Sequence, residues 1–324
     1  MKKKIIKMKN FFLNLYFGIK YKFKSYKPFL ISTMGRSGTW YNREFFYFYN
    51  KLLDGENPTQ IKKNMIDNKI KIKYLINLNY KMFSYNSVFI QHFLCPGFEK
   101  NYNGFYRKEW DKLVFYSEHI PAKFTKIMID KKIEDKVSPY LNPNTRIIYY
   151  LRNPLDQLVA YFKTIQTHLD ENLKYYYDLK TNRKKKFENI HEFLRKAGID
   201  MYIKHYLSFK LIKEKFPNNI LILYYENMVK KPEENFSKVL DFIGHKKKKN
   251  AFDEAIKLSS KESIIQLENA YGESISKAYK NKSDRQLNDA KIGKWKNQLN
   301  KDDISYIKKR FNEFDIDLES FVYE

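Results

Sequence analysis

Short apolar runs alternate along the chain with longer segments in which apolar residues recur every three or four positions. Five of the runs have the length and the β-branched or aromatic content of strands. They are residues 27–32, 87–91, 112–117, 145–151 and 219–225. Several are apolar at nearly every position, which is typical of strands in a parallel sheet that is covered on both faces.

The segments between these runs have the spacing of amphipathic helices. They are residues 38–52, 154–168, 187–215, 232–243 and 251–270. Pro154 suits the first helical position of its segment, and Gly244 suits a helix stop after its own. The alternation predicts an α/β fold, a single domain with a central, mostly parallel β-sheet flanked by helices.

Two stretches, 54–110 and 168–190, are less regular and rich in Asn and Tyr. We expect them to be excursions above the edge of the sheet, where substrate loops lie in such folds. No change of composition marks a domain boundary after the first strand. The chain is therefore predicted to hold one domain over 27–324, preceded by a basic N-terminal extension at 1–26.

The formal net charge of +25 would ordinarily indicate a nucleic acid or an anionic membrane as partner. However, only nine of the 62 basic residues are arginine, and Asn, Ile and Tyr are abundant, as in proteins from AT-rich genomes. This compositional bias accounts for the charge as readily as a polyanion does. The basic runs at 182–186 and 245–250 are predicted to be solvated loops. An arginine retained in such a chain is expected to be needed for its planar, bidentate guanidinium.

The single cysteine, Cys95, excludes an internal disulfide and a cysteine-based zinc site, which favours a cytoplasmic location. The extension 1–26 has a basic start and a short apolar centre. That centre is too short to span a bilayer and lacks a small-residue cleavage site. Association with an anionic membrane surface through this basic N-terminus remains open.

The stretch GRSGTW, residues 35–40, lies where the first strand should turn into a helix. Backbone amides at such a turn can hold an anion. A nucleoside triphosphate loop needs a lysine directly before its hydroxyl residue, whereas here the cation is Arg36, before Ser37 and Gly38. No strand ends in an aspartate suited to Mg²⁺, and the run 145–151 ends beside Arg152, which could bind another phosphate. A kinase or ATPase is therefore disfavoured.

Five stretches, in order along the chain, resemble motifs of the sulfotransferase family, whose members use 3′-phosphoadenosine 5′-phosphosulfate (PAPS). They are GRSGTW (35–40), EHIP (118–121), YYLRNPLDQLVAYF (149–162), ILYYENMVKKPEENFSKVLDFIG (222–244) and GKWKNQL (293–299). The resemblance extends from about residue 27 to residue 300. It implies a P-loop-like nucleotide-binding core, with PAPS as sulfuryl donor, 3′,5′-adenosine bisphosphate (PAP) as product and no metal.

The resemblance also implies the catalytic residues. Arg36 would stabilise the leaving phosphate, and His119 would take the proton from the acceptor, since neutral imidazole is available near pH 7. Glu118 is the alternative base, as in carbohydrate-type sulfotransferases. Outside this class, a basic protein that binds nucleic acid or membrane without catalysis is the alternative.

The cofactor contacts follow from the same resemblance. Ser37, Gly38 and Thr39 would bind the 5′-phosphate, and Arg152 would bind the 3′-phosphate through both guanidinium nitrogens. Ala160 stands where the family has a serine for the 3′-phosphate, so we expect a weaker cofactor affinity. The remaining expected contacts are Trp40, Tyr225, Ser260, Lys291, Trp295 and Lys296.

The acceptor would be a hydroxyl, or an amine, on a small molecule, a lipid or a carbohydrate, with no specific nucleic acid partner. The segments that should contact it, 54–110 and 168–190, share little with the family. The sequence therefore leaves the acceptor open.

Overall fold

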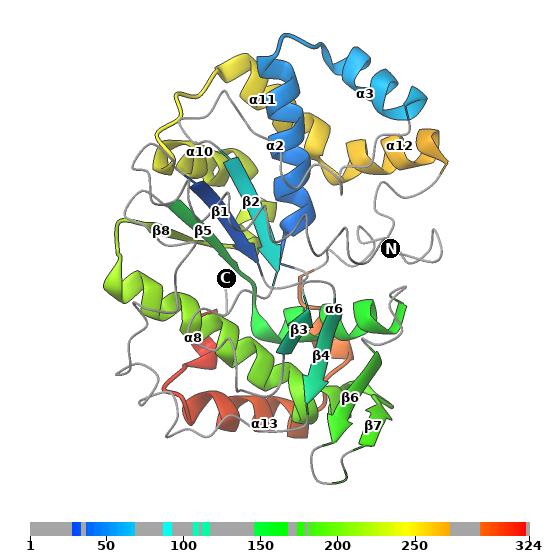
Figure 1. The fold of residues 1–324 in the computed structure, drawn as a ribbon, viewed down its shortest axis with the longest axis vertical. Helices are drawn as coiled ribbons and strands as arrows, with labels where there is room; N and C mark the ends of the chain where they lie inside the picture. Colours follow the sequence, from blue (N-terminus) through cyan, green and yellow to red (C-terminus); the bar gives the residue numbers. More distant parts are fainter. Residues whose placement is uncertain are drawn as a thin grey trace.

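Four parallel strands form the centre of the fold, in the order β2-β1-β5-β8 (Figure 1). They are β1 (Pro28–Thr33), β2 (Ser87–His92), β5 (Arg146–Leu151) and β8 (Ile220–Tyr224). Each coincides with an apolar run of the sequence, so the predicted α/β fold with a parallel sheet is confirmed. The computed structural model describes residues 28–33, 37–68, 87–92, 106–109, 112–116, 146–167, 174–178, 181, 183–272 and 292–321.

Strand β5 separates two hydrophobic cores because successive side chains of a strand point to opposite faces. Tyr149 belongs to a core shared with the helices on one side of the sheet, and Tyr150 belongs to the core on the other side. Figure 1 shows the two layers, above and below the sheet. The upper helices are α2 (Thr39–Leu53), α10 (Pro232–Phe242) and α11 (Lys249–Ser259). The lower ones are α6 (Pro154–Thr167), α8 (Ile199–Lys215) and α13 (Lys301–Asn312).

Two predicted helices are interrupted. The segment 251–270 contains α11 and α12 (Lys261–Tyr271), because Ser260 has an extended backbone and its side chain accepts a hydrogen bond from the Ser263 amide. The segment 187–215 contains α7 (Ile190–Phe193), a π-helical turn at Leu194–Gly198 and then α8. Helix α13 lies in a part of the chain for which the sequence predicted no helix.

A second sheet lies beside the lower helices, with the order β3-β4-β6-β7 (Figure 1). It comprises β3 (Tyr106–Glu109), β4 (Lys112–Tyr116), β6 (Tyr175–Asp178) and β7 (Arg183–Lys186). The run 112–117 thus supplies a strand of this sheet and not of the central one. The basic run 182–186 was predicted to be a loop, and this is wrong for Arg183–Lys186, because backbone pairing with β6 makes it a strand although its side chains are exposed.

Short elements complete the described chain. The excursion 54–110 includes α3 (Pro58–Asp67), and α9 (Tyr225–Lys230) follows β8 directly. Near the C-terminus lie two 3₁₀ turns, η6 (Lys294–Asn297) and η7 (Leu318–Phe321). The basic run 245–250 was predicted to be a solvated loop; residues 245–248 are a loop, but the prediction is wrong for Lys249 and Asn250, which form the start of α11. The predicted extension 1–26 lies outside the described residues.

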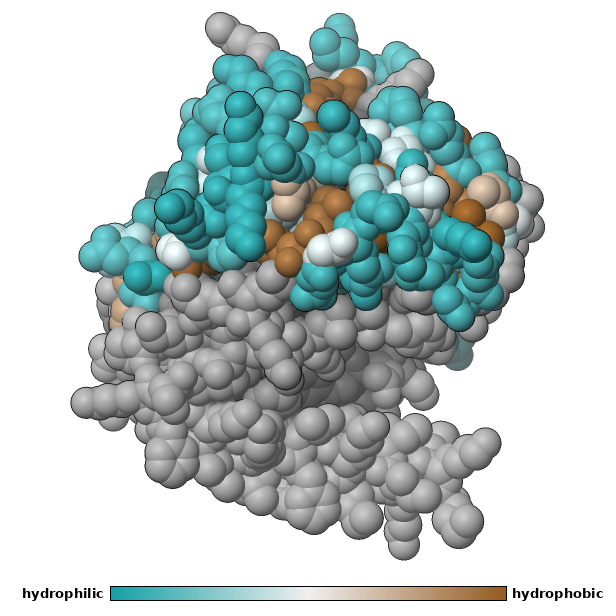
Figure 2. All heavy atoms as spheres, turned by 90° about the horizontal axis from the view of Figure 1, so that it is seen from above, coloured by the Kyte–Doolittle hydropathy of each residue, from teal (hydrophilic) through white to brown (hydrophobic). Residues whose placement is uncertain are grey.

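Hydrophilic side chains cover most of the described part of the molecule when it is seen from above, and apolar ones show between them (Figure 2). Among the described helices, none is long and apolar enough to cross a membrane.

Candidate functional site

The two described residues directly before α2, Ser37 and Gly38, suit the binding of an anion at the helix N-terminus. Gly38 has a φ of 86°, in the left-handed region that favours glycine, and caps the N-terminus of the 15-residue helix α2. Its carbonyl accepts hydrogen bonds from the Asn42 backbone amide at 3.1 Å and from the Asn42 side chain at 3.0 Å. Ser37 beside it is buried. The positive end of the helix dipole therefore lies at this turn, where it favours a negative charge.

Tyr225, the first residue of α9, packs over the turn. A Cβ atom added to Gly38 would lie 3.0 Å from Cδ2 of Tyr225. Gly38 is therefore required both for its backbone conformation and for the close approach of the tyrosine ring.

Arg152 packs against the same tyrosine ring. Its guanidinium carbon is 4.7 Å from the centroid of the Tyr225 ring, and only 2% of the residue is exposed. The hydroxyl of Tyr202 donates a hydrogen bond to the Arg152 carbonyl at 2.8 Å. A buried guanidinium held against an aromatic ring is suited to binding an anion such as phosphate.

Glu226 fixes the loop that carries Arg152. A carboxylate oxygen of Glu226 accepts a hydrogen bond from the Asn153 amide at 3.0 Å. Burial raises the pKa of Glu226, although the bond from Asn153 and the charge of Arg152 oppose the rise. Asn153 in turn accepts a bond from the Leu155 amide at the start of α6 and donates one to the Phe321 carbonyl. The Asn153–Glu226 bond was not predicted from the sequence, although Glu226 directly follows one apolar strand run and Asn153 lies two positions after another.

Asp156, in the first turn of α6, binds the turn that leads into η6. Its carboxylate accepts hydrogen bonds from the backbone amides of Gly293 at 2.6 Å and Trp295 at 3.2 Å. Trp295 is half-buried and packs against the lower core, whereas Lys296 is exposed. Sequence reasoning did not single out Asp156, because its two partners are distant along the chain.

The structure therefore brings several predicted residues into one connected region. Tyr225 links the Ser37–Gly38 turn to Arg152, and Asp156 links the Arg152 loop to the turn that carries Trp295 and Lys296. Trp40 lies nearby on α2, with the guanidinium carbon of Arg43 4.9 Å from the centroid of its ring system.

Other predicted residues are not brought into this network. Ser260 caps α12, and Ala160 is buried within α6. Arg36, Glu118, His119 and Lys291 lie outside the described residues, as does the side chain of Thr39. Their roles stay predictions. Among the described residues, no group of three or more His, Cys, Asp or Glu side chains could hold a metal ion.

A four-stranded parallel sheet flanked by helices, with a glycine capping the helix that follows its strand β1, defines an α/β protein. The family model of the sulfotransferase domain matches residues 27–314. The chain therefore belongs to the sulfotransferase family, and the resemblance predicted from its motifs is confirmed.

Among characterised proteins, mouse sulfotransferase 2A6 is 32% identical over 129 residues, 37% of this chain. The match spans 39% of that relative. Mouse sulfotransferase SULT7A1, solved with PAP, superposes with a TM-score of 0.48 at 15% identity and covers 89% of this chain and 84% of its own. A retinol dehydratase solved with androsterone and PAP also gives 0.48, at 12% identity, covering 89% of this chain and 80% of its own.

Proposed function

We propose that this protein is a PAPS-dependent sulfotransferase that moves a sulfuryl group to a hydroxyl, or an amine, of a small acceptor. The observation that carries the proposal is the contact series from the Gly38 turn through Tyr225 to Arg152. The ring of Tyr225 contacts both Gly38 at the N-terminus of α2 and the buried guanidinium of Arg152. Family membership supports PAPS as the nucleotide of this site.

The donor groups fit a nucleotide with phosphates at two positions. The backbone amides at the start of α2 suit the 5′-phosphosulfate, and the Arg152 guanidinium suits a separate 3′-phosphate. ATP carries phosphates only at its 5′ position, so it would leave the guanidinium without a matching anion. The lysine that a triphosphate loop requires is absent from this turn.

The transfer needs position, electrostatics and a base from this chain. Bound PAPS would supply the activated sulfuryl group. Arg36 would stabilise negative charge on the leaving phosphate, and His119 would take the proton from the acceptor oxygen. Glu118, next to His119, is the alternative base.

We propose a small molecule as acceptor, with lipid and carbohydrate hydroxyls as the alternatives to be tested. A hydroxysteroid, a simple phenol and an amino sugar are the first probes, one for each of these three classes of acceptor. We also propose a cytoplasmic location. Peripheral contact between the basic N-terminus and anionic membranes is a further hypothesis to be tested.

The first experiment measures thermal unfolding with PAP, 5′-AMP, ATP with Mg²⁺, or no ligand. A ligand at 100 times its dissociation constant stabilises the native state by about 2.7 kcal/mol. We expect PAP to raise the melting temperature by about 5 °C, and 5′-AMP and ATP to have much smaller effects. Equal shifts with 5′-AMP and PAP would show that the 3′-phosphate is not recognised.

Transfer from radiolabelled PAPS, with and without EDTA, then tests catalysis. We expect full activity in EDTA. Steeply salt-dependent binding to duplex DNA or anionic vesicles, with no PAP binding, would instead support the non-catalytic alternative.

A further inference from the structure

The carboxylate of Asp156 accepts hydrogen bonds from a segment that lies far from it in the sequence. One oxygen accepts the Gly293 amide at 2.6 Å, and the other accepts the Trp295 amide at 3.2 Å. The residue is only 2% exposed. An acidic residue in the first turn of a helix is locally favourable in any case, but this one also fixes a turn of backbone that belongs to a different part of the fold.

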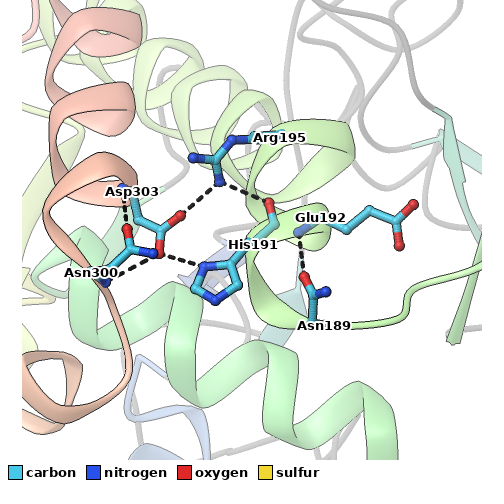
Figure 3. A network of polar contacts seen from close by, with 6 residues as sticks. All are labelled: Asn189, His191, Glu192, Arg195, Asn300 and Asp303. Carbon is cyan, nitrogen blue, oxygen red and sulfur yellow. Dashed lines mark hydrogen bonds and ion pairs between the residues drawn. The ribbon is translucent and has the colours of Figure 1, made fainter.

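The turn at residues 292–298 is held from both ends. At its start, Gly293 has a φ of 82°, and its amide and that of Trp295 bind Asp156. At its end, Asn300 caps α13, and Asp303 in the first turn of that helix binds His191 and Arg195 (Figure 3). Asp156 therefore sets where this turn begins relative to α6.

Asp156 also lies close to the phosphate-binding residue of the proposed site. Arg152 precedes it by four residues, and Asn153 between them is bonded to Glu226 and to the start of α6. A displacement of the 292–298 turn relative to Asp156 is thus a displacement relative to Arg152.

We propose that Asp156 is a positioning residue for the cofactor, which holds the 292–298 turn against the Arg152 loop so that Trp295 and Lys296 contact the nucleotide. The proposal rests on the proposed function and names a residue that neither the motifs nor the comparisons assign. Asp156 acts through the backbone of the turn and does not itself bind the nucleotide.

Because Asp156 is negatively charged, the direction in which PAP affinity changes when it is replaced tests the proposal. If its carboxylate affected the site only through its negative charge, removing that charge would strengthen the binding of an anionic nucleotide. If it acts by holding the turn, removing it weakens the binding. The two explanations predict opposite changes in PAP affinity.

The experiment compares Asp156→Ala, Asp156→Asn and Asp200→Asn with the wild type. Asp200 is a matched control, since it is equally buried and its carboxylate binds Arg310, joining α8 to α13 away from the turn. For each variant we would measure the dissociation constant of PAP by calorimetry, the melting temperature without ligand, and kcat and KM for PAPS.

We expect Asp156→Ala to weaken PAP binding about tenfold or more, since two hydrogen bonds to a charged acceptor are lost. Asp156→Asn, which keeps one acceptor oxygen, should be intermediate and still weaker than the wild type. In both variants KM for PAPS should rise while kcat at saturating PAPS changes little, because the turn holds the cofactor and not the acceptor. Asp200→Asn should lower the melting temperature and leave the PAP affinity within about twofold.

Wild-type affinity or tighter binding in both Asp156 variants would overturn the inference and leave the proposed function intact. If Asp156→Ala does not fold, the direction of the change in PAP affinity in Asp156→Asn decides between the two explanations. Failure of the wild type itself to bind PAP would overturn the proposed function, and this inference with it.

Discussion

The Nδ1 atom of His191 lies 2.6 Å from a carboxylate oxygen of Asp303, whose other oxygen lies 2.7 Å from a guanidinium nitrogen of Arg195 (Figure 3). Asp303 also accepts a bond from the Asn300 amide and so completes the capping box of α13. One buried carboxylate thus joins α7 and its π-helical continuation to the C-terminal helix.

Replacing Asp303 with asparagine should destabilise the protein by about 2–3 kcal/mol, because several hydrogen bonds to a charged acceptor are lost or weakened. The measurement is urea unfolding at neutral pH. His191→Ala is the matched comparison and should cost less than 1 kcal/mol, about the value of a partly exposed pair. Equal losses in the two variants would contradict a central role for the carboxylate.

The same residue predicts a dependence of stability on pH. Burial alone would raise the pKa of Asp303, but hydrogen bonds from Arg195, Asn300 and His191 hold it below its ordinary value of 3.8. The folded protein therefore binds this proton less readily than the unfolded chain does. The stabilisation is present above pH 3.8 and is lost as the pH falls through the lower folded value. The difference in stability between wild type and Asp303→Asn should shrink accordingly, and a constant difference would contradict this account.

Gly38→Ala should weaken PAP binding because the new methyl group would meet Tyr225 at 3.0 Å. Gly55→Ala is a matched control, since Gly55 has a φ of 89° and nothing within 4 Å of an added Cβ atom. Both variants should lose about 1–2 kcal/mol of stability through the left-handed backbone. Only Gly38→Ala should also lose PAP affinity in calorimetry, and a parallel loss in Gly55→Ala would show that strain alone is responsible.

Arg152→Gln should abolish the thermal shift produced by PAP, since it removes the cation proposed for the 3′-phosphate. Arg146 offers a matched control at the other end of β5, where its guanidinium donates to the Asn218 carbonyl at 2.9 Å. Arg146→Gln should retain the shift. Discrimination between PAP and 5′-AMP should disappear in Arg152→Gln, and its persistence would place the 3′-phosphate elsewhere.

The identity of the base can be decided by single-turnover transfer from PAPS. His119→Ala should reduce the rate by about 10²- to 10⁴-fold, the usual contribution of a general base, whereas Glu118→Gln should stay near the wild-type rate. The opposite pattern in the two variants would make Glu118 the base and favour a carbohydrate-type enzyme.

The central sheet could be predicted from the sequence because β5 and β8 contribute side chains to both hydrophobic cores and so are apolar at nearly every position. Other elements lack such a signal. The break at Ser260 was missed because the apolar helical spacing continues across it, whereas β7 was missed because an exposed strand needs only backbone partners.

The candidate site was predictable where its residues form local motifs, as Ser37, Gly38 and Arg152 do. Asp156 and Glu226 could not be assigned in this way, since each binds backbone amides contributed by another segment. A backbone amide is the same for every residue type except proline, and such a contact leaves no pattern in the sequence.

The basic residues of strand β7 have a physical consequence for self-association of the protein. The strand ends its sheet among the described strands, so the backbone groups of its outer side are of the kind that recruit a second chain during aggregation. All four of its residues, Arg183–Lys186, are positively charged, and Lys185 pairs with Asp178 of the neighbouring strand. Two copies approaching edge to edge would bring like charges together. The lysine-rich edge therefore opposes self-association at the point where an open sheet is most prone to it.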